Sequence, residues 1–123
     1  MLREIFTNSL KHPNIVDIKE SFLTPGGKFI TISELALGNL IHYREKLKSL
    51  STQRIAEIML NICLGLEFTH KKGIIHRDIS PDNILFFDDD TFKICDFGLA
   101  AFAKTSVLCT GKDNYMAPEV RKS

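Results

Sequence analysis

One long helix is the strongest structural signal in this sequence, and we predict that it spans Ser51 to Lys72. Ser51 and Thr52 are favourable N-cap residues, because their hydroxyl oxygens can accept hydrogen bonds from the unpaired N–H groups of a first helical turn. Gly73 follows directly, and glycine is the usual residue where a helix ends in left-handed backbone. Apolar residues recur at helical spacing and predict one buried face, made of Ile55, Ile58, Met59, Ile62 and Leu66.

Short β-rich runs precede this helix. Ile15–Ile18 and Phe29–Ser33 are separated by the turn residues Thr24–Gly27, so they predict a hairpin. Residues 2–11 favour a short helix that Pro13 ends, because the residue before a proline is driven out of helical backbone.

Further β-rich runs follow the helix. Ile74–Ile75 predicts a short buried strand, and Asn83–Phe87 and Phe92–Cys95 predict a second hairpin around the acidic turn 88–90. Residues 99–116 are small and polar, which predicts a long loop of the kind that usually has a function.

Composition narrows the class of protein. The chain has 123 residues, 44% hydrophobic and 25% charged, which is ordinary for one soluble domain or part of one. Its net charge of +1 gives no indication of a nucleic acid or an anionic membrane as partner. Three cysteines without paired spacing argue against a disulfide framework or a zinc site, and favour an intracellular location, cytoplasmic or nuclear. No apolar run approaches the ~20 residues of a membrane span.

Three motifs occur in a fixed order along the chain. His76-Arg77-Asp78 with Asn83 comes first, then residues 96–98 (Asp-Phe-Gly), then residues 117–119 (Ala-Pro-Glu). This ordered set resembles the catalytic domain of protein kinases, and the resemblance extends over nearly the whole chain. It implies the two-lobed α+β kinase fold, ATP and Mg²⁺ as donor and cofactor, and a protein substrate.

The resemblance assigns the phosphoryl-transfer residues. Asp78 would be the catalytic base for the substrate hydroxyl, and Asn83 and Asp96 would be the Mg²⁺ ligands, since Mg²⁺ prefers hard oxygen donors. Pro81 and the stretch 115–119 match the serine/threonine form of the family. Arg77 is a candidate clamp for a phosphorylated residue, because guanidinium binds phosphate through a bidentate fork.

The resemblance also assigns the nucleotide site. Ser33 would stand at the gatekeeper position beside the adenine. Glu34 and Ala36 would offer hinge backbone groups, Asn39 falls where the ribose is often contacted, and Leu85 would form the floor under the purine.

The same alignment divides the chain into a small-lobe part (1–33), a hinge (34–38) and a large-lobe part (39–123). A glycine-rich phosphate loop and a strand lysine are not found, so we expect a kinase-like domain that is truncated, incomplete at both ends. Glu4 is the candidate for the glutamate that pairs with that lysine, although its spacing from Pro13 differs by one residue from the family's.

Ser80 departs from the family, in which a lysine occupies this place in the serine/threonine form. Lys112 falls where the family has a threonine, and we predict that Lys112 restores the positive charge near Asp78. The alternative is a solvated loop lysine. A second alternative concerns the whole chain: a pseudokinase, or a truncated module that binds nucleotide or partners without useful catalysis. The substrate protein, subfamily, regulator and oligomeric state are left open.

Overall fold

The computed structural model describes residues 10–97, 101–102 and 112–121. Its helices and strands follow in the order β1 (Ile18–Leu23), β2 (Phe29–Ser33), β3 (Gly38–Asn39), α2 (Leu40–Lys46), α3 (Thr52–Lys71), β4 (Ile74–Ile75), β5 (Ile84–Asp88), β6 (Thr91–Ile94), β7 (Ala101–Phe102) and α4 (Pro118–Arg121). Short 3₁₀ turns occur at Pro81–Asn83 and Asp113–Tyr115. The candidate Glu4 lies outside the described residues, and so does the predicted helix at residues 2–11 except for its last two residues.

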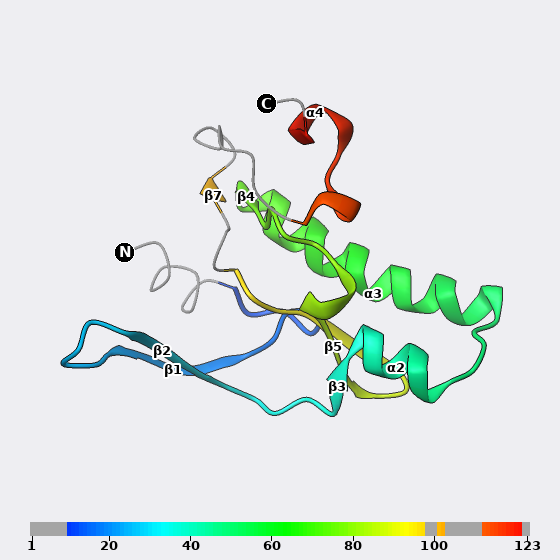
Figure 1. Cartoon of the computed structure of the whole chain (residues 1–123), viewed down its shortest axis with the longest axis horizontal. Helices are drawn as coiled ribbons and strands as arrows, with labels where there is room; N and C mark the ends of the chain where they lie inside the picture. The colour runs from blue at the N-terminus through cyan, green and yellow to red at the C-terminus, as the bar shows by residue number, and fades with distance from the viewer. Residues whose placement is uncertain (1–9, 98–100, 103–111, 122–123) are drawn as a thin grey trace.

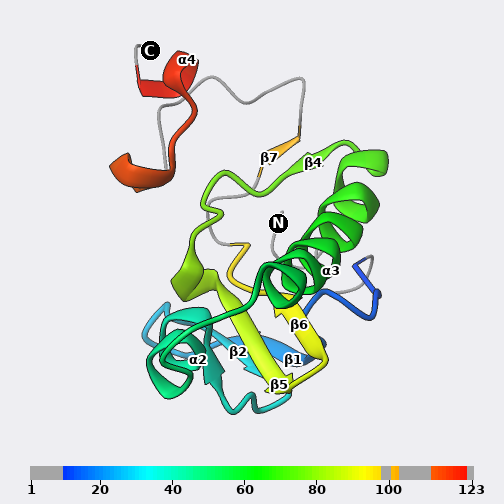
Figure 2. The ribbon, with the colours of Figure 1, turned by 90° about the vertical axis from the view of Figure 1, so that its right-hand side faces the viewer.

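The strands form three small antiparallel groups, with β1 paired to β2, β3–β5–β6 in one sheet, and β4 paired to β7. The β1–β2 hairpin projects to one side, whereas α3 runs along the other part of the molecule (Figure 1). Figure 2 shows α3 packed over β6, with α2 beside β5. The α+β class is therefore confirmed. The division at residues 33 and 38 stays a prediction.

Helix α3 begins and ends where the sequence predicts. The Ser51 hydroxyl oxygen accepts a hydrogen bond from the Arg54 N–H (3.1 Å). Gly73 has a φ of 75°, the left-handed backbone that glycine adopts without a steric penalty. Local signals at both ends thus fix the helix that carries the chain into the site.

The buried face of α3 differs from the prediction. Ile58 and Ile62 are buried as expected, but Ile55 and Met59 remain 48% and 50% exposed. The buried stripe continues instead through Gly65 and Thr69. A Cβ added at Gly65 would lie only 2.8 Å from the Asn14 carbonyl oxygen, so the small residue allows the helix to approach the chain before β1.

The first hairpin forms as predicted, although its first strand starts at Ile18 and not at Ile15. Ile15 instead makes an isolated parallel bridge to Ile94. The Ile94 N–H donates to the Asn14 carbonyl and the Val16 N–H to the Ile94 carbonyl, each at 2.9 Å. Residues 14–16 thereby extend the central sheet beside β6.

The main core lies between α3, α2 and the central sheet, and consists of Tyr43, Ile58, Ile62, Ile84, Phe86, Phe92 and Ile94. Tyr43 meets Phe86 and Phe92 edge to face, with ring centroids 5.1 Å apart in each pair. This core supports β5 and β6, the two strands that flank the segments carrying the motif residues. Within the described residues, no helix has the length and apolar character needed to cross a membrane.

Candidate active site

His76 links the two motif loops. It is 1% exposed. Its Nδ1 accepts from the Asp78 N–H (3.1 Å) and its Nε2 lies 2.8 Å from the Cys95 carbonyl oxygen, so Nε2 carries the proton and donates. Its ring also meets that of Phe97, with centroids 4.6 Å apart. Burial lowers the pKa of His76, which keeps the ring neutral in this bridge.

Two residues on either side of this bridge have left-handed backbone. Arg77 has a φ of 71° and Asp96 a φ of 59°. Such backbone costs about 1–2 kcal/mol in a residue with a Cβ and persists only where the surroundings hold it. The His76 bridge supplies that restraint, so both loops are held in one defined arrangement.

Asp78 and Asn83 lie in direct contact. The Asn83 Nδ2 donates to the Asp78 carbonyl oxygen (2.9 Å) and to its carboxylate Oδ2 (3.0 Å). Asn83 is 6% exposed and the Asp78 side chain 11%. The structure therefore brings together the predicted base and one predicted metal ligand, and it fixes the direction of the carboxylate.

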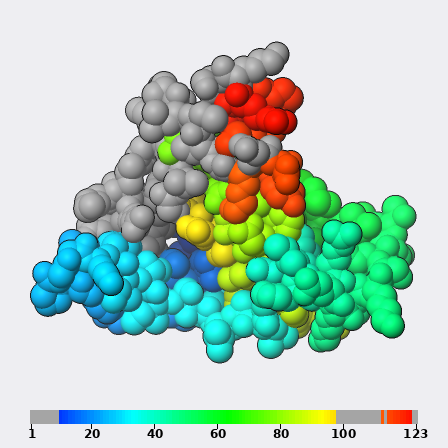
Figure 3. Space-filling model, viewed as in Figure 1, coloured from blue at the N-terminus to red at the C-terminus, as the bar shows by residue number. Residues whose placement is uncertain are grey.

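Lys112 closes the other side of Asp78. Its Nζ lies 2.8 Å from Oδ1 and 2.9 Å from Oδ2 of that carboxylate, and 3.4 Å from Oδ2 of Asp82. The Asp78 carboxylate raises the pKa of Lys112, which keeps the ammonium charged. Figure 3 shows the orange segment that begins at Lys112 lying against the yellow-green atoms of the loop that contains Asp78.

Ser80 contacts the neighbouring carboxylate, that of Asp82. It is 3% exposed, and its hydroxyl donates to Asp82 Oδ1. This bond is the largest cause of the lowered pKa of Asp82. Asp82 was not among the predicted site residues, and the only local signal for it is the spacing of a serine two residues before an aspartate, which favours a short side-chain contact.

The donor set suits a metal ion that arrives with a nucleotide. The Asn83 amide nitrogen donates both of its hydrogen bonds to Asp78. The Asn83 amide oxygen accepts a hydrogen bond from no described residue. The Cys95 N–H donates to the Asn83 carbonyl (2.9 Å). Asp96, which is exposed, follows Cys95 directly, so its backbone begins one residue from this contact. Among the described residues no group of three His, Cys, Asp or Glu side chains forms a metal cage. Mg²⁺ commonly binds one or two protein oxygens together with phosphates and waters, so the residues fit.

Ser33, the predicted gatekeeper, ends β2, and the predicted hinge residues Glu34 and Ala36 lie between β2 and β3. The Ser33 hydroxyl is exposed and donates to the Glu34 carbonyl (3.3 Å), the group predicted to face the adenine. The Glu34 carboxylate pairs with Lys93 on β6, and Ala36 is half-buried in the turn before β3. Of these residues, only Glu34 is anchored by its side chain to the central sheet.

Asn39 and Leu85 are cross-strand partners, because β3 pairs with β5 at these two residues. The Asn39 side chain accepts from the His42 N–H (3.1 Å) and so caps α2. Asn39, at the position predicted to lie near a ribose, thus uses its side-chain oxygen as a helix cap, whereas Leu85 lies on the strand that leads away from Asn83. Their predicted roles toward a nucleotide stay predictions.

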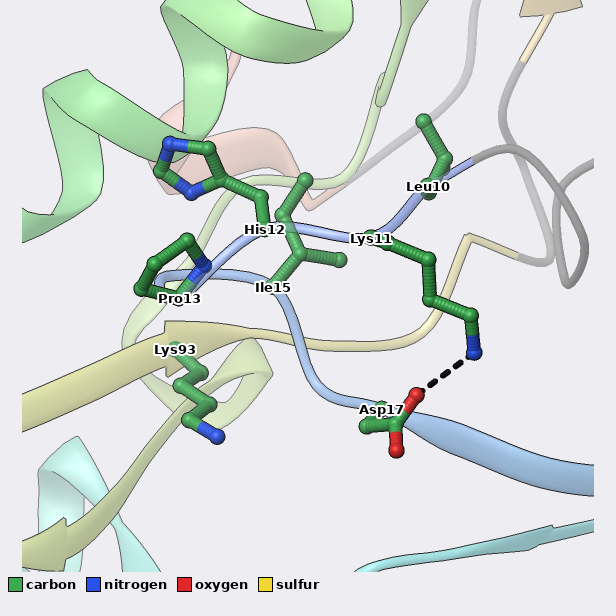
Figure 4. Close-up of a pocket in the computed structure, with 7 residues that line it drawn as sticks. All are labelled: Leu10, Lys11, His12, Pro13, Ile15, Asp17 and Lys93. Carbon is green, nitrogen blue, oxygen red and sulfur yellow. Dashed lines mark hydrogen bonds and ion pairs between the residues drawn. The ribbon is translucent and has the colours of Figure 1, made fainter.

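A separate hollow of about 340 Å³ lies where the chain before β1 meets β6 (Figure 4). Its lining residues are Leu10, Lys11, His12, Pro13, Ile15, Asp17 and Lys93. Lys11 and Asp17 form an ion pair (2.6 Å) at one side. None of the predicted site residues lines this hollow, so it is distinct from the cluster around Asp78.

Comparison with known proteins gives a consistent result. The family model described as the protein kinase domain matches residues 1–123. The mitogen-activated protein kinase sty1 of Schizosaccharomyces pombe is 38% identical over 114 residues, which cover 90% of this chain and 32% of that protein. The serine/threonine-protein kinase unc-51 of Caenorhabditis elegans is 34% identical, over 98% of this chain and 15% of that protein. The serine/threonine-protein kinase Nek1 of Mus musculus is 35% identical, over 91% of this chain and 10% of that protein. The chain thus spans a third or less of the length of these relatives.

Proposed function

This chain belongs to the protein kinase family, and from that premise we propose that it carries the phosphoryl-transfer site of an ATP- and Mg²⁺-dependent serine/threonine protein kinase. The observation that carries the proposal is the contact between Asp78 and Asn83, held by the His76 bridge to the chain before Asp96. Packing does not require a polar contact between the Asp78 and Asn83 side chains, whereas phosphoryl transfer depends on positioned charge.

The chemistry is a transfer of the γ-phosphoryl group to a serine or threonine hydroxyl. The hydroxyl oxygen forms a bond to the γ-phosphorus, the bond from that phosphorus to the bridging oxygen of ADP breaks, and the hydroxyl proton passes to the Asp78 carboxylate. Asn83 and Asp96 would hold Mg²⁺, which when bound offsets the negative charge of the phosphates. Asn83 also orients Asp78 through the 3.0 Å hydrogen bond to its Oδ2.

Serine/threonine specificity rests on Pro81, on residues 115–119, and on relatives that are named serine/threonine-protein kinases. An intracellular location, cytoplasmic or nuclear, is part of the proposal. Its support is that Cys63 and Cys95 are free thiols, as expected in a reducing compartment.

The test measures phosphate transfer from ATP to serine- and threonine-containing peptides by the full-length protein. Asp78→Asn keeps the size of the side chain and removes the proton acceptor. We expect kcat to fall by about 10²–10⁴, the usual contribution of a positioned general base. Asp89→Asn, in the exposed turn between β5 and β6, is the matched control and should leave kcat unchanged. Equal activity in wild type and Asp78→Asn would refute the assignment.

One observation favours a second function, a kinase-like module that binds nucleotide without turnover. Residue 80 is a serine and contributes no positive charge to the site, and its hydroxyl is buried against Asp82. A protein of this kind would bind Mg²⁺-ATP in calorimetry and lose that binding in Asp96→Ala. It would transfer no phosphate to any peptide.

A further inference from the structure

Two carboxylates, those of Asp78 and Asp82, meet at the ammonium of Lys112. Asp78 and Asp82 both direct carboxylate oxygens to one place, and Asp96 follows the strand that ends beside Asn83. A nucleotide brings more negative charge into such a site. Phosphoryl transfer is catalysed by neutralising charge on the phosphate oxygens, so carboxylates alone would oppose it.

Lys112 is placed to supply the missing positive charge. Its ammonium contacts both oxygens of Asp78, and its side chain remains 41% exposed, whereas the Asp78 side chain is only 11% exposed. The charge therefore lies at the opening of the site and not beneath it. An incoming anion would meet the ammonium there.

The contacts of Lys112 leave room for a ligand. An ammonium has three N–H donors. The two contacts to Asp78 are short, but the contact to Asp82 is 3.4 Å, too long for a strong hydrogen bond. A phosphate oxygen can replace Asp82 as a partner without disturbing the ion pair with Asp78.

Asp78 likewise keeps capacity for its proposed role. A carboxylate has about four lone-pair sites. Described donors use three of them, namely Lys112 on each oxygen and Asn83 on Oδ2. One site remains for the proton of a substrate hydroxyl.

We propose that Lys112 is the phosphate-binding cation of this site, which holds the Asp78 carboxylate and contacts the transferred phosphoryl group of ATP. The inference rests on the proposed function and assigns the charge to a residue 34 positions away from the base. Lys112 forms no covalent bond in the step. It stays protonated while the γ-phosphoryl group passes from ATP to the substrate oxygen, ADP leaves and the hydroxyl proton passes to Asp78.

The experiment compares Lys112→Gln and Lys112→Arg in the full-length protein, with kcat and KM measured separately for ATP and peptide. Gln removes the charge while keeping a hydrogen-bonding side chain, and Arg keeps the charge. We expect kcat to fall by about 10² in Lys112→Gln, comparable to the loss of one preorganised donor, and to recover at least tenfold of that in Lys112→Arg. Lys71→Ala removes a lysine from an exposed ion pair with Glu67 (3.7 Å) and should have no effect.

The outcomes separate the two proposals. If wild type transfers phosphate and Asp78→Asn does not, a kcat of Lys112→Gln within twofold of wild type overturns the role of Lys112 while the function stands. If wild type transfers no phosphate, the proposed function fails and the role of Lys112 is decided by binding. Affinity for Mg²⁺-ATP that weakens at least tenfold in Lys112→Gln but not in Lys71→Ala supports the phosphate contact, and a smaller change overturns it.

Discussion

Replacing Asn83 with alanine tests whether one side chain both stabilises the fold and orients the proposed base. Asn83→Ala removes the donor to the Asp78 carboxylate (3.0 Å) and the donor to the Asp78 carbonyl (2.9 Å). A hydrogen bond to a charged group contributes about 1.5–3 kcal/mol to stability, and one to a neutral group about 0.5–1.5 kcal/mol. Asn83 is buried, so bulk water does not replace the hydrogen bonds that Asp78 loses. We therefore expect the free energy of unfolding to fall by about 2–4 kcal/mol.

The assay pairs urea denaturation of the full-length protein with kcat measured on the folded fraction. We expect Asn83→Ala to lower kcat by at least about tenfold as well, since both the direction of Asp78 and one proposed metal ligand are lost.

Asn61→Ala is the matched control. The Asn61 Oδ1 accepts from Asn14 (2.8 Å) and from the Phe92 N–H (3.2 Å), far from the site, so its loss should reduce stability without changing kcat. Two results would refute the reasoning: a stability change below about 0.5 kcal/mol in Asn83→Ala, or an equal loss of kcat in both variants.

Two further predictions concern stability, each measured by urea denaturation. Gly65→Ala gains about 1 kcal/mol of helix propensity, but its Cβ would lie 2.8 Å from the Asn14 carbonyl oxygen, so overpacking of about 1–3 kcal/mol should make the variant less stable. Gly26→Ala, whose nearest neighbour would be 3.9 Å away, is the control, and a more stable Gly65→Ala would contradict the packing argument. Burial lowers the pKa of His76 in the folded chain. Below about pH 6.5 the unfolded chain therefore binds a proton that the folded chain does not, so the free energy of unfolding falls as the pH drops below that value. We expect a smaller loss between pH 7.5 and 5.5 in His76→Gln, and equal losses in the two proteins would show that His76 does not contribute.

The sequence predicts those parts of the fold that local signals determine. The Ser51 cap, the Gly73 terminus and the turn at 24–27 are each decided by a few adjacent residues, and each is found in the structure. The buried face of α3 depends instead on what packs against it. Gly65 and Thr69 lie on that face because residue 14 and strand β4 approach closely, and neither residue carries a hydrophobic signal that periodicity could detect.

The start of β1 was misplaced for a similar reason. Ile15 and Val16 are buried, and their apolar side chains favour a strand at that point. The structure pairs this stretch with Ile94 in the central sheet, and pairing with β2 begins only at Ile18. Hydrophobicity shows that a residue is buried but not which strand it joins, because that choice depends on residues far along the chain.

Motifs identify the residues of the site but not their contacts. Asp78, Asn83 and Asp96 could be selected by type and spacing, yet the neutral His76 bridge and the left-handed backbone at Arg77 depend on two loops meeting. Motif spacing does not identify Asp82, because its partners are a buried hydroxyl and a lysine from a distant segment.

Position 80 shows why a departure from a motif is weak grounds for inferring inactivity. A motif records where a charge lies along the chain, whereas catalysis depends on where it lies in space. Ser80 carries no charge and turns toward Asp82, but Lys112 places an ammonium within 2.9 Å of both oxygens of Asp78. Because a Coulomb interaction depends on distance and surroundings and not on chain connectivity, the site keeps a cation beside its proposed base. The serine at position 80 therefore does not decide whether the site is active. Measuring kcat in Lys112→Gln tests whether the charge at residue 112 is needed.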